Sequence, residues 1–177
     1  MSKVKFATVW LDGCSGCHMS FLDIDERLIA LAEVIELVYS PLVDNKEFPA
    51  DVDVTMVEGS VSSEEDLHKI KYIRERTKVL ISLGDCAVTG NVPSLRNSVG
   101  KEAVLQRAYM ESDLLNPQIP SQVVPKLLSI VRPVHSVVKV DVYIPGCPPS
   151  ADTIFNVLND LLAGKTPNAM QYTRFGA

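Results

Sequence analysis

Positive charge is scarce in this 177-residue sequence, which has 17 Lys and Arg against 22 Asp and Glu and a formal net charge of −5. Nucleic acids and anionic membranes are bound by basic surfaces, so this balance argues against both kinds of partner. Aromatic residues make up only 6% of the chain, which gives little support for a stacked flavin. No apolar run approaches the ~18 residues of a membrane-spanning helix. The sequence therefore predicts a globular protein that is not membrane-spanning.

A secretory signal is not expected either. The apolar stretch Phe6–Leu11 is shorter than the roughly 7–15 residues of a signal core, and Asp12 ends it. We therefore expect a cytoplasmic protein, in which cysteines are more often ligands or reactive thiols than disulfides. With 46% apolar residues, 9 Gly and 11 Pro, the composition excludes disordered and fibrous chains. The length fits one domain over residues 1–177 with its own core.

Short apolar runs rich in β-branched residues predict a parallel sheet, because strands covered on both faces lack polar alternation. Amphipathic stretches separate the runs, and this alternation favours right-handed crossovers and a doubly wound α/β fold. Five strands suggest the flavodoxin-like order 2-1-3-4-5. The predicted strands are Val4–Leu11, Val34–Tyr39, Val52–Glu58, Val79–Leu83 and Val137–Ile144.

Three amphipathic helices are predicted around these strands. The segment Ser62–Lys78 opens with a capping box formed by Ser62 and Glu65. The last helix has Ser150 as its cap and ends at Gly164. The first helix follows the first strand, and its apolar face comprises Phe21, Ile24, Leu28 and Leu31.

The region Asn91–Val134 interrupts the alternation of strands and helices. It contains five prolines, and only one helix fits well, at Lys101–Met110. A second helix is expected after Pro125, because proline is tolerated in the first helical turn. We interpret this region as an irregular, Pro-rich excursion before the last strand and as an interaction surface.

All four cysteines follow predicted strands. Cys14 and Cys17 come after the first strand. Cys86 follows the fourth strand, and Cys147 follows the fifth. Because the carboxyl ends of parallel strands line the ligand-binding crevice of an open α/β sheet, the four thiols are expected to converge there. A glycine close before each thiol permits tight turns at this edge.

Four thiolates suit either tetrahedral zinc or an iron–sulfur cluster. Structural zinc commonly uses two C-x-x-C pairs, whereas this chain combines one pair with two distant single cysteines. An α/β core of this size needs no metal staple, so we favour one [4Fe–4S] cluster held by all four cysteines. A zinc-stapled structural protein is one alternative. A thiol oxidoreductase using Cys14 and Cys17 is another, although it gives Cys86 and Cys147 no role.

At its cysteine motifs the sequence resembles the small subunit of [NiFe] hydrogenases and the related cluster-bearing subunit of respiratory complex I. The motifs are Cys14-Ser-Gly-Cys17, Gly84-Asp-Cys-Ala87 and Pro145-Gly-Cys-Pro-Pro149. Longer segments are similar to the small subunit of the soluble, bidirectional NAD(P)-linked hydrogenase. These segments are Thr8–Asp23, Tyr39–Val43, Val57–Gly59 and Gly84–Asn91.

The resemblance implies an electron-transfer subunit of an NAD(P)-linked [NiFe] hydrogenase. Cys14, Cys17, Cys86 and Cys147 would ligate the proximal [4Fe–4S] cluster, next to a Ni–Fe centre in a separate large subunit. Electrons would pass to iron–sulfur and FMN-containing subunits of an NAD(P)-reducing module. The resemblance implies no catalytic residue in this chain, because hydrogen is split in the large subunit.

Three departures from related patterns bear on this assignment. Complex I relatives carry adjacent cysteines at the first motif, whereas two residues separate Cys14 from Cys17, which favours a hydrogenase over a complex I-type quinone reductase. Many hydrogenase small subunits have a glutamate two residues after the second cysteine, where this chain has Met19. No cysteine follows Cys147, so one four-cysteine cluster is expected.

Other side chains near the predicted edge have more than one interpretation. Glu58 ends the third strand, where a proton-handling or interface role and an ordinary cap are both open. His18 follows Cys17 and is a candidate hydrogen-bonding group beside the cluster. Asp85 is interpreted as a cap of its own loop, and Trp10 as a core residue. An FMN site in this chain is disfavoured because the loop after the first strand lacks a hydroxyl-rich phosphate cradle.

Overall fold

A five-stranded parallel sheet forms the centre of the molecule in the computed structural model, which describes residues 2–111 and 113–173. Its strand order is β2-β1-β3-β5-β7. The predicted order 2-1-3-4-5 is therefore confirmed, because the additional short strand β4 lies outside this sheet. The five strands are β1 (Val4–Trp10), β2 (Ile35–Tyr39), β3 (Val52–Glu58), β5 (Thr77–Leu83) and β7 (Val142–Ile144).

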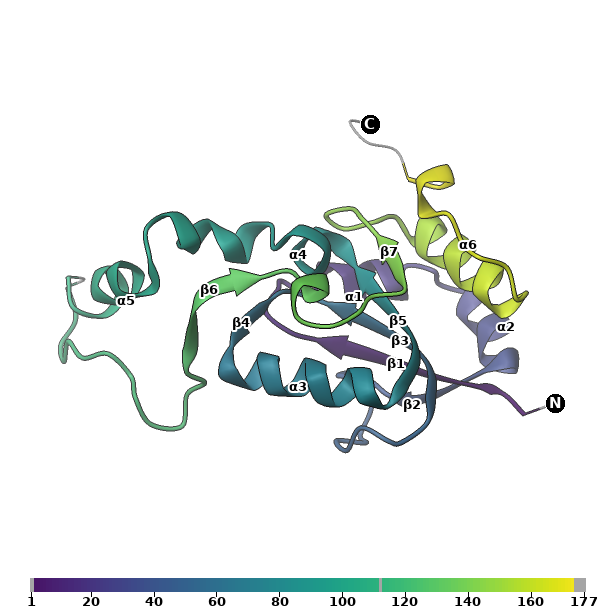
Figure 1. Cartoon of the computed structure of the whole chain (residues 1–177), viewed down its shortest axis with the longest axis horizontal. Coiled ribbons are helices and arrows are strands. Elements are labelled where there is room, and N and C mark those ends of the chain that lie inside the picture. The colour runs from purple at the N-terminus through teal and green to yellow at the C-terminus, as the bar shows by residue number, and fades with distance from the viewer. Residues whose placement is uncertain (1, 112, 174–177) are drawn as a thin grey trace.

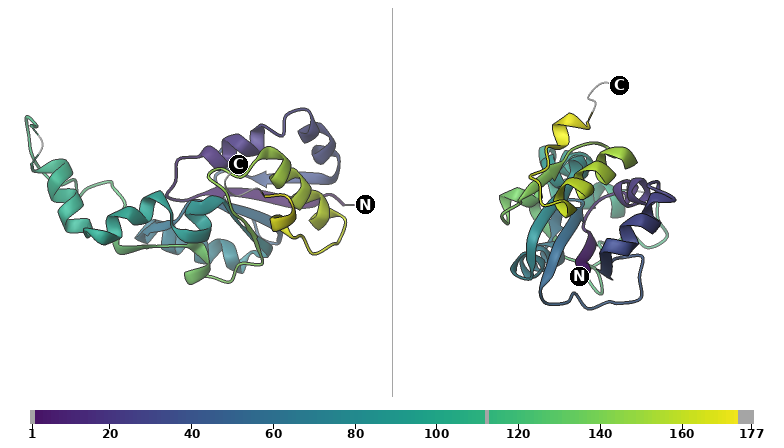
Figure 2. Two further views of the ribbon diagram at one scale, coloured as in Figure 1. Left: turned by 90° about the horizontal axis from the view of Figure 1, so that it is seen from above. Right: turned by 90° about the vertical axis from the view of Figure 1, so that its right-hand side faces the viewer.

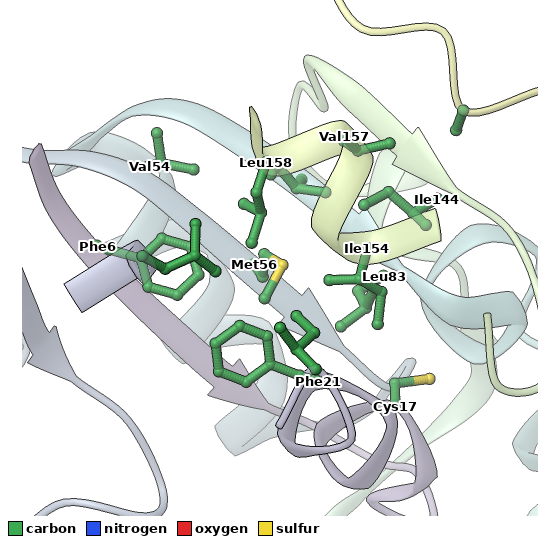
Figure 3. Close-up of a cluster of buried hydrophobic side chains, with 14 residues drawn as sticks. Phe6, Cys17, Phe21, Val54, Met56, Leu83, Ile144, Ile154, Val157 and Leu158 are labelled. Atoms are coloured by element: carbon green, nitrogen blue, oxygen red, sulfur yellow. The ribbon is translucent and has the colours of Figure 1, made fainter. Parts of the chain in front are cut away.

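Helices cover both faces of the sheet, as Figures 1 and 2 show. On one face α1 (Gly16–Leu22), α2 (Arg27–Val34) and α6 (Ala151–Leu162) enclose an apolar cluster that includes Phe6, Phe21, Met56 and Ile154 (Figure 3). On the other face, α3 (Glu64–Glu75), α4 (Gly84–Thr89) and the 3-10 helix η2 (Val134–Ser136) cover a second cluster. The central strands are thus buried on both sides, as their apolar and β-branched sequences predict.

The helix ends follow local capping chemistry. The Ser150 hydroxyl accepts a hydrogen bond from the Thr153 amide at 3.2 Å, so the predicted cap of α6 is confirmed. The capping box of α3 is formed by Ser63 and Asp66, one residue later than the predicted pair. The first predicted helix is divided into α1 and α2, since Asp25 between them has φ 60°, which no helical residue adopts.

The excursion contains the 3-10 helix η1 (Val92–Ser98), α5 (Lys101–Tyr109) and the strand β6 (Leu127–Arg132). The predicted helix over Lys101–Met110 is confirmed, but the helix predicted after Pro125 is wrong. There, β6 pairs antiparallel with β4 (Val61–Ser63). Because every residue of β4 is buried, its backbone needs a hydrogen-bonding partner, and strand pairing outweighs the local helix signal.

The last predicted strand, Val137–Ile144, is correct only for its final three residues. The 3-10 helix η2 precedes it, and the chain joins the sheet at Asp141, whose amide donates to the Leu80 carbonyl at 2.9 Å. A further 3-10 helix, η3 (Ala169–Gln171), follows α6. Within the described ranges, no helix is both long enough and apolar enough to cross a bilayer.

Candidate functional site

The carboxyl edge of the sheet holds all four cysteines. Cys14 lies in the loop after β1, and Cys17 lies in the first turn of α1. Cys86 belongs to α4, which follows β5 directly, and Cys147 lies in the loop after β7. The predicted placement of each thiol beyond a strand end is confirmed. The three cysteine-bearing segments therefore meet at one edge although they are far apart in sequence.

Three hydrogen bonds connect these segments. The Asp85 amide donates to the Gly146 carbonyl at 2.8 Å, and the Gly146 amide donates to the Asp85 carboxylate at 2.7 Å. The Ser20 hydroxyl of α1 donates to the Pro149 carbonyl at 2.5 Å. Asp85 thus joins two cysteine loops instead of capping its own loop, and Ser20 joins the third segment to them. Neither connection has a signal in the sequence, because the bonded residues are remote from each other along the chain.

Close packing brings the start of α4 against Cys17. Gly84 has φ +78°, and a Cβ atom there would lie 2.2 Å from the Cys17 sulfur. Only glycine fits both that backbone conformation and that contact. The glycine before Cys86 therefore allows the β5–α4 junction to reach the thiol on α1.

Burial and mutual repulsion make the thiols difficult to ionise together. Burial raises the pKa of Cys17 most, and negative charges on Glu58 and the other three cysteines raise it further. Burial also raises the pKa of Cys86, with smaller contributions from Cys147 and Cys14. Because each thiolate opposes the charge of its neighbours, the complete set is stabilised as thiolates only beside strong positive charge, such as that of bound metal ions.

Hydrogen-bond donors reach two of the sulfur atoms. The Gly16 amide lies 3.4 Å from the Cys14 sulfur, and the Asn91 side-chain amide lies 3.3 Å from the Cys147 sulfur. Such donors stabilise a thiolate and adjust the redox potential of a cluster that it binds. The contact of Asn91 with a cysteine 56 positions away had no signal in the sequence.

A buried acid–histidine pair supports the helix that carries Cys17. Glu58 is only 1% exposed and accepts hydrogen bonds from the His18 amide at 2.9 Å and the Cys17 amide at 3.4 Å. Its carboxylate also contacts the His18 ring nitrogen Nδ1. Of the two roles left open for Glu58, the structure thus shows a cap, which satisfies otherwise unpaired amides at the start of α1. Burial without these partners would be costly.

Four cysteine thiols are a donor set that suits either an iron–sulfur cluster or a tetrahedral zinc ion. In residues 2–111 and 113–173, no three His, Cys, Asp or Glu side chains are arranged to hold one ion. In a [4Fe–4S] cluster each thiolate binds a different iron. A thiol oxidoreductase would use Cys14 and Cys17 and would leave Cys86 and Cys147, at the same edge, without a role.

One side chain at this edge is placed differently from the sequence prediction. Trp10 was expected in the core, but 42% of it is exposed, and its indole nitrogen donates to the Gly13 carbonyl at 3.3 Å. The core prediction is therefore wrong. As the last residue of β1, Trp10 lies where the sheet ends and its cover ends with it.

A doubly wound α/β sheet with four cysteines at its carboxyl edge defines the class of the protein. Residues 14–161 match the family of the 20 kDa subunit of NADH:ubiquinone oxidoreductase, and the chain belongs to this family. It is 45% identical over 168 residues to the delta subunit of the NAD-reducing hydrogenase HoxS of Cupriavidus necator, covering 92% of this chain and 80% of that relative.

Two further comparisons confirm the predicted resemblance. A solved structure of an NAD+-reducing [NiFe]-hydrogenase in the H2-reduced state superposes with a TM-score of 0.91 at 40% identity, covering 94% of this chain and 95% of that one. One subunit of the F420-non-reducing hydrogenase vhu of Methanocaldococcus jannaschii is 41% identical over 166 residues. The match covers 93% of this chain but only 58% of the archaeal relative.

Proposed function

We propose that this chain is the electron-transfer small subunit of a [NiFe] hydrogenase and that one [4Fe–4S] cluster is ligated by Cys14, Cys17, Cys86 and Cys147. The observation that carries the proposal is the gathering of four thiols, from three segments of the chain, at one sheet edge. Membership of the oxidoreductase family and the likeness to hydrogenase subunits support it. When bound, such a cluster supplies one-electron redox chemistry.

The residues of the chain divide the work of holding this group. Cys17 provides a buried ligand. Gly84 has no side chain and therefore leaves room beside the Cys17 sulfur. The paired hydrogen bonds between Asp85 and Gly146 fix the separation of the Cys86 and Cys147 segments. Asn91 donates toward the Cys147 sulfur, which favours the reduced state by offsetting negative charge.

The proposed partners follow from the same relatives. A large subunit with the Ni–Fe centre would cover the carboxyl edge of the sheet where the four cysteines lie, called the cysteine edge below. Iron–sulfur and flavin (FMN) subunits would form an NAD(P)-reducing module. The assignment to NAD(P) depends on the Cupriavidus necator relative, a subunit of a NAD-reducing enzyme, whereas the archaeal relative belongs to an F420-non-reducing one. We propose one cluster-binding domain over residues 1–177 in a cytoplasmic complex.

Metal analysis of the anaerobically purified protein tests the proposed site. We expect about four irons and four sulfides per chain, with a paramagnetic signal that appears on reduction. One zinc per chain would instead support a structural metal site. A metal-free protein with a titratable Cys14–Cys17 dithiol would support a thiol oxidoreductase. Either of these outcomes would overturn the cluster assignment.

Copurification of the native complex separates the hydrogenase from the quinone reductase of the complex I type. We expect a nickel-containing large subunit and hydrogen-dependent reduction of NAD+ or NADP+. A complex without nickel that passes electrons to a quinone would contradict the hydrogenase assignment. The cluster assignment would remain intact in that case, because the iron and sulfide content is measured independently of the electron acceptor.

A further inference from the structure

Residues 91–133, called the arm below, lack an apolar core of their own. Neither η1 nor α5, both described in full, contains a buried residue. In the described part of the arm, only Val131 is buried. A nine-residue helix is marginally stable in water without packing, so α5 needs more cover than the described residues supply. Figures 1 and 2 both show α5 standing away from the central sheet.

The base of the arm is nevertheless fixed by hydrogen bonds. The Arg96 guanidinium donates to the carbonyls of Leu128 and Ser62, both at 2.9 Å. The Asn97 side chain donates to the Val131 carbonyl at 3.0 Å and accepts from the Val131 amide at 2.8 Å. These bonds connect η1 to β6 and β4. The arm is therefore held in one position before any partner binds, which lowers the entropic cost of binding.

The surface of the arm is strongly apolar. A groove of about 500 Å3 lies between α5 and the segment from Pro120 to Leu127. Leu115 and Val123 are fully exposed, and 69% of Leu95 is exposed. Exposed apolar side chains gathered in one segment favour binding to another protein.

Charge distribution indicates what kind of protein binds there. The arm has five Lys and Arg against three Asp and Glu, whereas the rest of the sequence has 12 against 19. Two arms would therefore repel each other. An arm bound to the acidic body of a second copy would make a head-to-tail contact, which generates rings or open filaments instead of a closed pair. A different chain, with an apolar surface and acidic residues, fits the arm better.

The arm is continuous with the cysteine edge. It follows α4, the helix of Cys86, and its first residue, Asn91, contacts the Cys147 sulfur. At the same edge, Met19 is 57% exposed although it lies two residues from Cys17. A protein that covers this edge would therefore also meet the base of the arm.

We propose that the arm is a docking surface for the subunit that covers the cysteine edge, with η1, the apolar groove and the exposed side chain of Leu115 as its main contacts. This inference rests on the proposed function, under which that subunit carries the Ni–Fe centre. A single partner then spans both surfaces. Its apolar contact with the arm helps to exclude water from the cysteine edge.

Photo-crosslinking in the purified native complex tests this assignment. A photoreactive residue is placed at Met19, at Leu95, at Leu115 or, as a matched control, at Ile29, which is 72% exposed on α2 at the other end of the molecule. We expect the first three probes to capture the same subunit and the control not to capture it. Capture by the arm probes of another subunit, of a second copy, or of nothing would overturn the proposal.

Affinity measurements add an independent test. Leu95→Asp and Leu115→Asp should each weaken assembly with that subunit by about tenfold or more, since buried apolar anchors dominate interfaces. Ile29→Asp should leave affinity unchanged. Unchanged affinity of both arm variants would contradict the proposal. Iron content and the nickel content of the captured subunit are measured in parallel, so a failure of the proposed function is recognised separately from a failure of the docking surface.

Discussion

The body of the protein, residues 2–90 and 134–173, and the arm acquire their shapes in opposite ways. In the body, the central strands are buried on both faces, and side chains such as Met56 and Ile81 are almost completely inaccessible. The arm holds about half of the exposed large apolar side chains, and polar bonds from Arg96 and Asn97 fix its base. The body is therefore stabilised by burial of its own apolar side chains, whereas the apolar side chains of the arm are placed for burial by another chain.

The proposed cluster ligands lie on the body side of this division. Cys86 is five residues from the start of the arm, yet it is connected to the other cysteines through Asp85, Gly84 and the strand β5. Changes in the body should therefore affect the cluster or global stability. Changes at the tip of the arm should affect assembly alone.

The largest effect is expected from loss of one proposed ligand. Cys86→Ser should lower the iron content from about four per chain to well below one and abolish the signal of the reduced protein, as severely as Cys14→Ser. Leu115→Ser, in the arm, is the control and should retain full iron content. Metal analysis and EPR on anaerobically purified protein measure all three. An intact cluster in the Cys86 variant would remove the basis of the proposed site.

The next largest effect is expected at the buried pair. Glu58→Ala leaves His18 without its partner and uncaps α1, so we expect a loss of about 3–5 kcal/mol in the free energy of unfolding. Glu58→Gln keeps an acceptor for the amides and should lose less. Denaturant unfolding measures both, with the exposed Glu36→Ala as a control that should change stability by less than about 0.5 kcal/mol. A loss below about 1 kcal/mol for Glu58→Ala would contradict the structural role assigned to this pair.

Core truncation compares body and arm directly. Ile81→Ala on β5 should cost about 2–5 kcal/mol, because its side chain is completely buried. Leu115→Ala in the arm should change the stability of the isolated chain by less than about 0.5 kcal/mol. Urea unfolding of both variants provides the measurement. Equal losses would show that the arm shares the body's core, and the comparison between the two regions would then be wrong.

Prediction from the sequence succeeded best where a signal is repeated along the chain. The central strands could be predicted because each is rich in apolar and β-branched residues, and the placement of Cys86 and Cys147 followed from those strands. The same approach failed at β6, since a single short segment after Pro125 carries no signal for its partner β4. Which of two structures such a segment adopts depends on contacts made only in the folded chain.

The candidate site was predictable in its thiols but not in the groups that support them. Cysteine at a strand end is visible in the sequence, whereas the pairing of Glu58 with His18 joins residues 40 positions apart. The contact of Asn91 with the Cys147 sulfur is equally remote. Only the order of the parallel strands could have indicated which cysteine-bearing segments face each other. The side-chain partners are determined by contacts that form only in the folded chain.

The smallest expected effect concerns how the two regions respond to acid. Burial alone would raise the pKa of Asp141, but hydrogen bonds from the Leu80 amide, Arg74 and Lys139 outweigh it and hold the pKa below its ordinary value. The carboxylate therefore contributes stability above its ordinary pKa, and this contribution is lost as the pH falls through the lowered pKa. The corresponding bonds of the arm, from Arg96 and Asn97, do not titrate in this range.

Amide hydrogen exchange at Leu80 measures this difference. Asp141→Asn should reduce protection at pH 7 by the equivalent of about 1–3 kcal/mol, and the difference from the wild type should shrink below about pH 4. Exchange at Val131, in the arm, should not differ between the two proteins at any pH, and Asp44→Asn provides an exposed control. If the Leu80 difference stayed constant down to pH 3, roughly a unit below the ordinary carboxyl pKa, the ionised Asp141 would not be its source. A parallel loss at Val131 would mean that acid sensitivity extends across the boundary, because body and arm would then open as one unit.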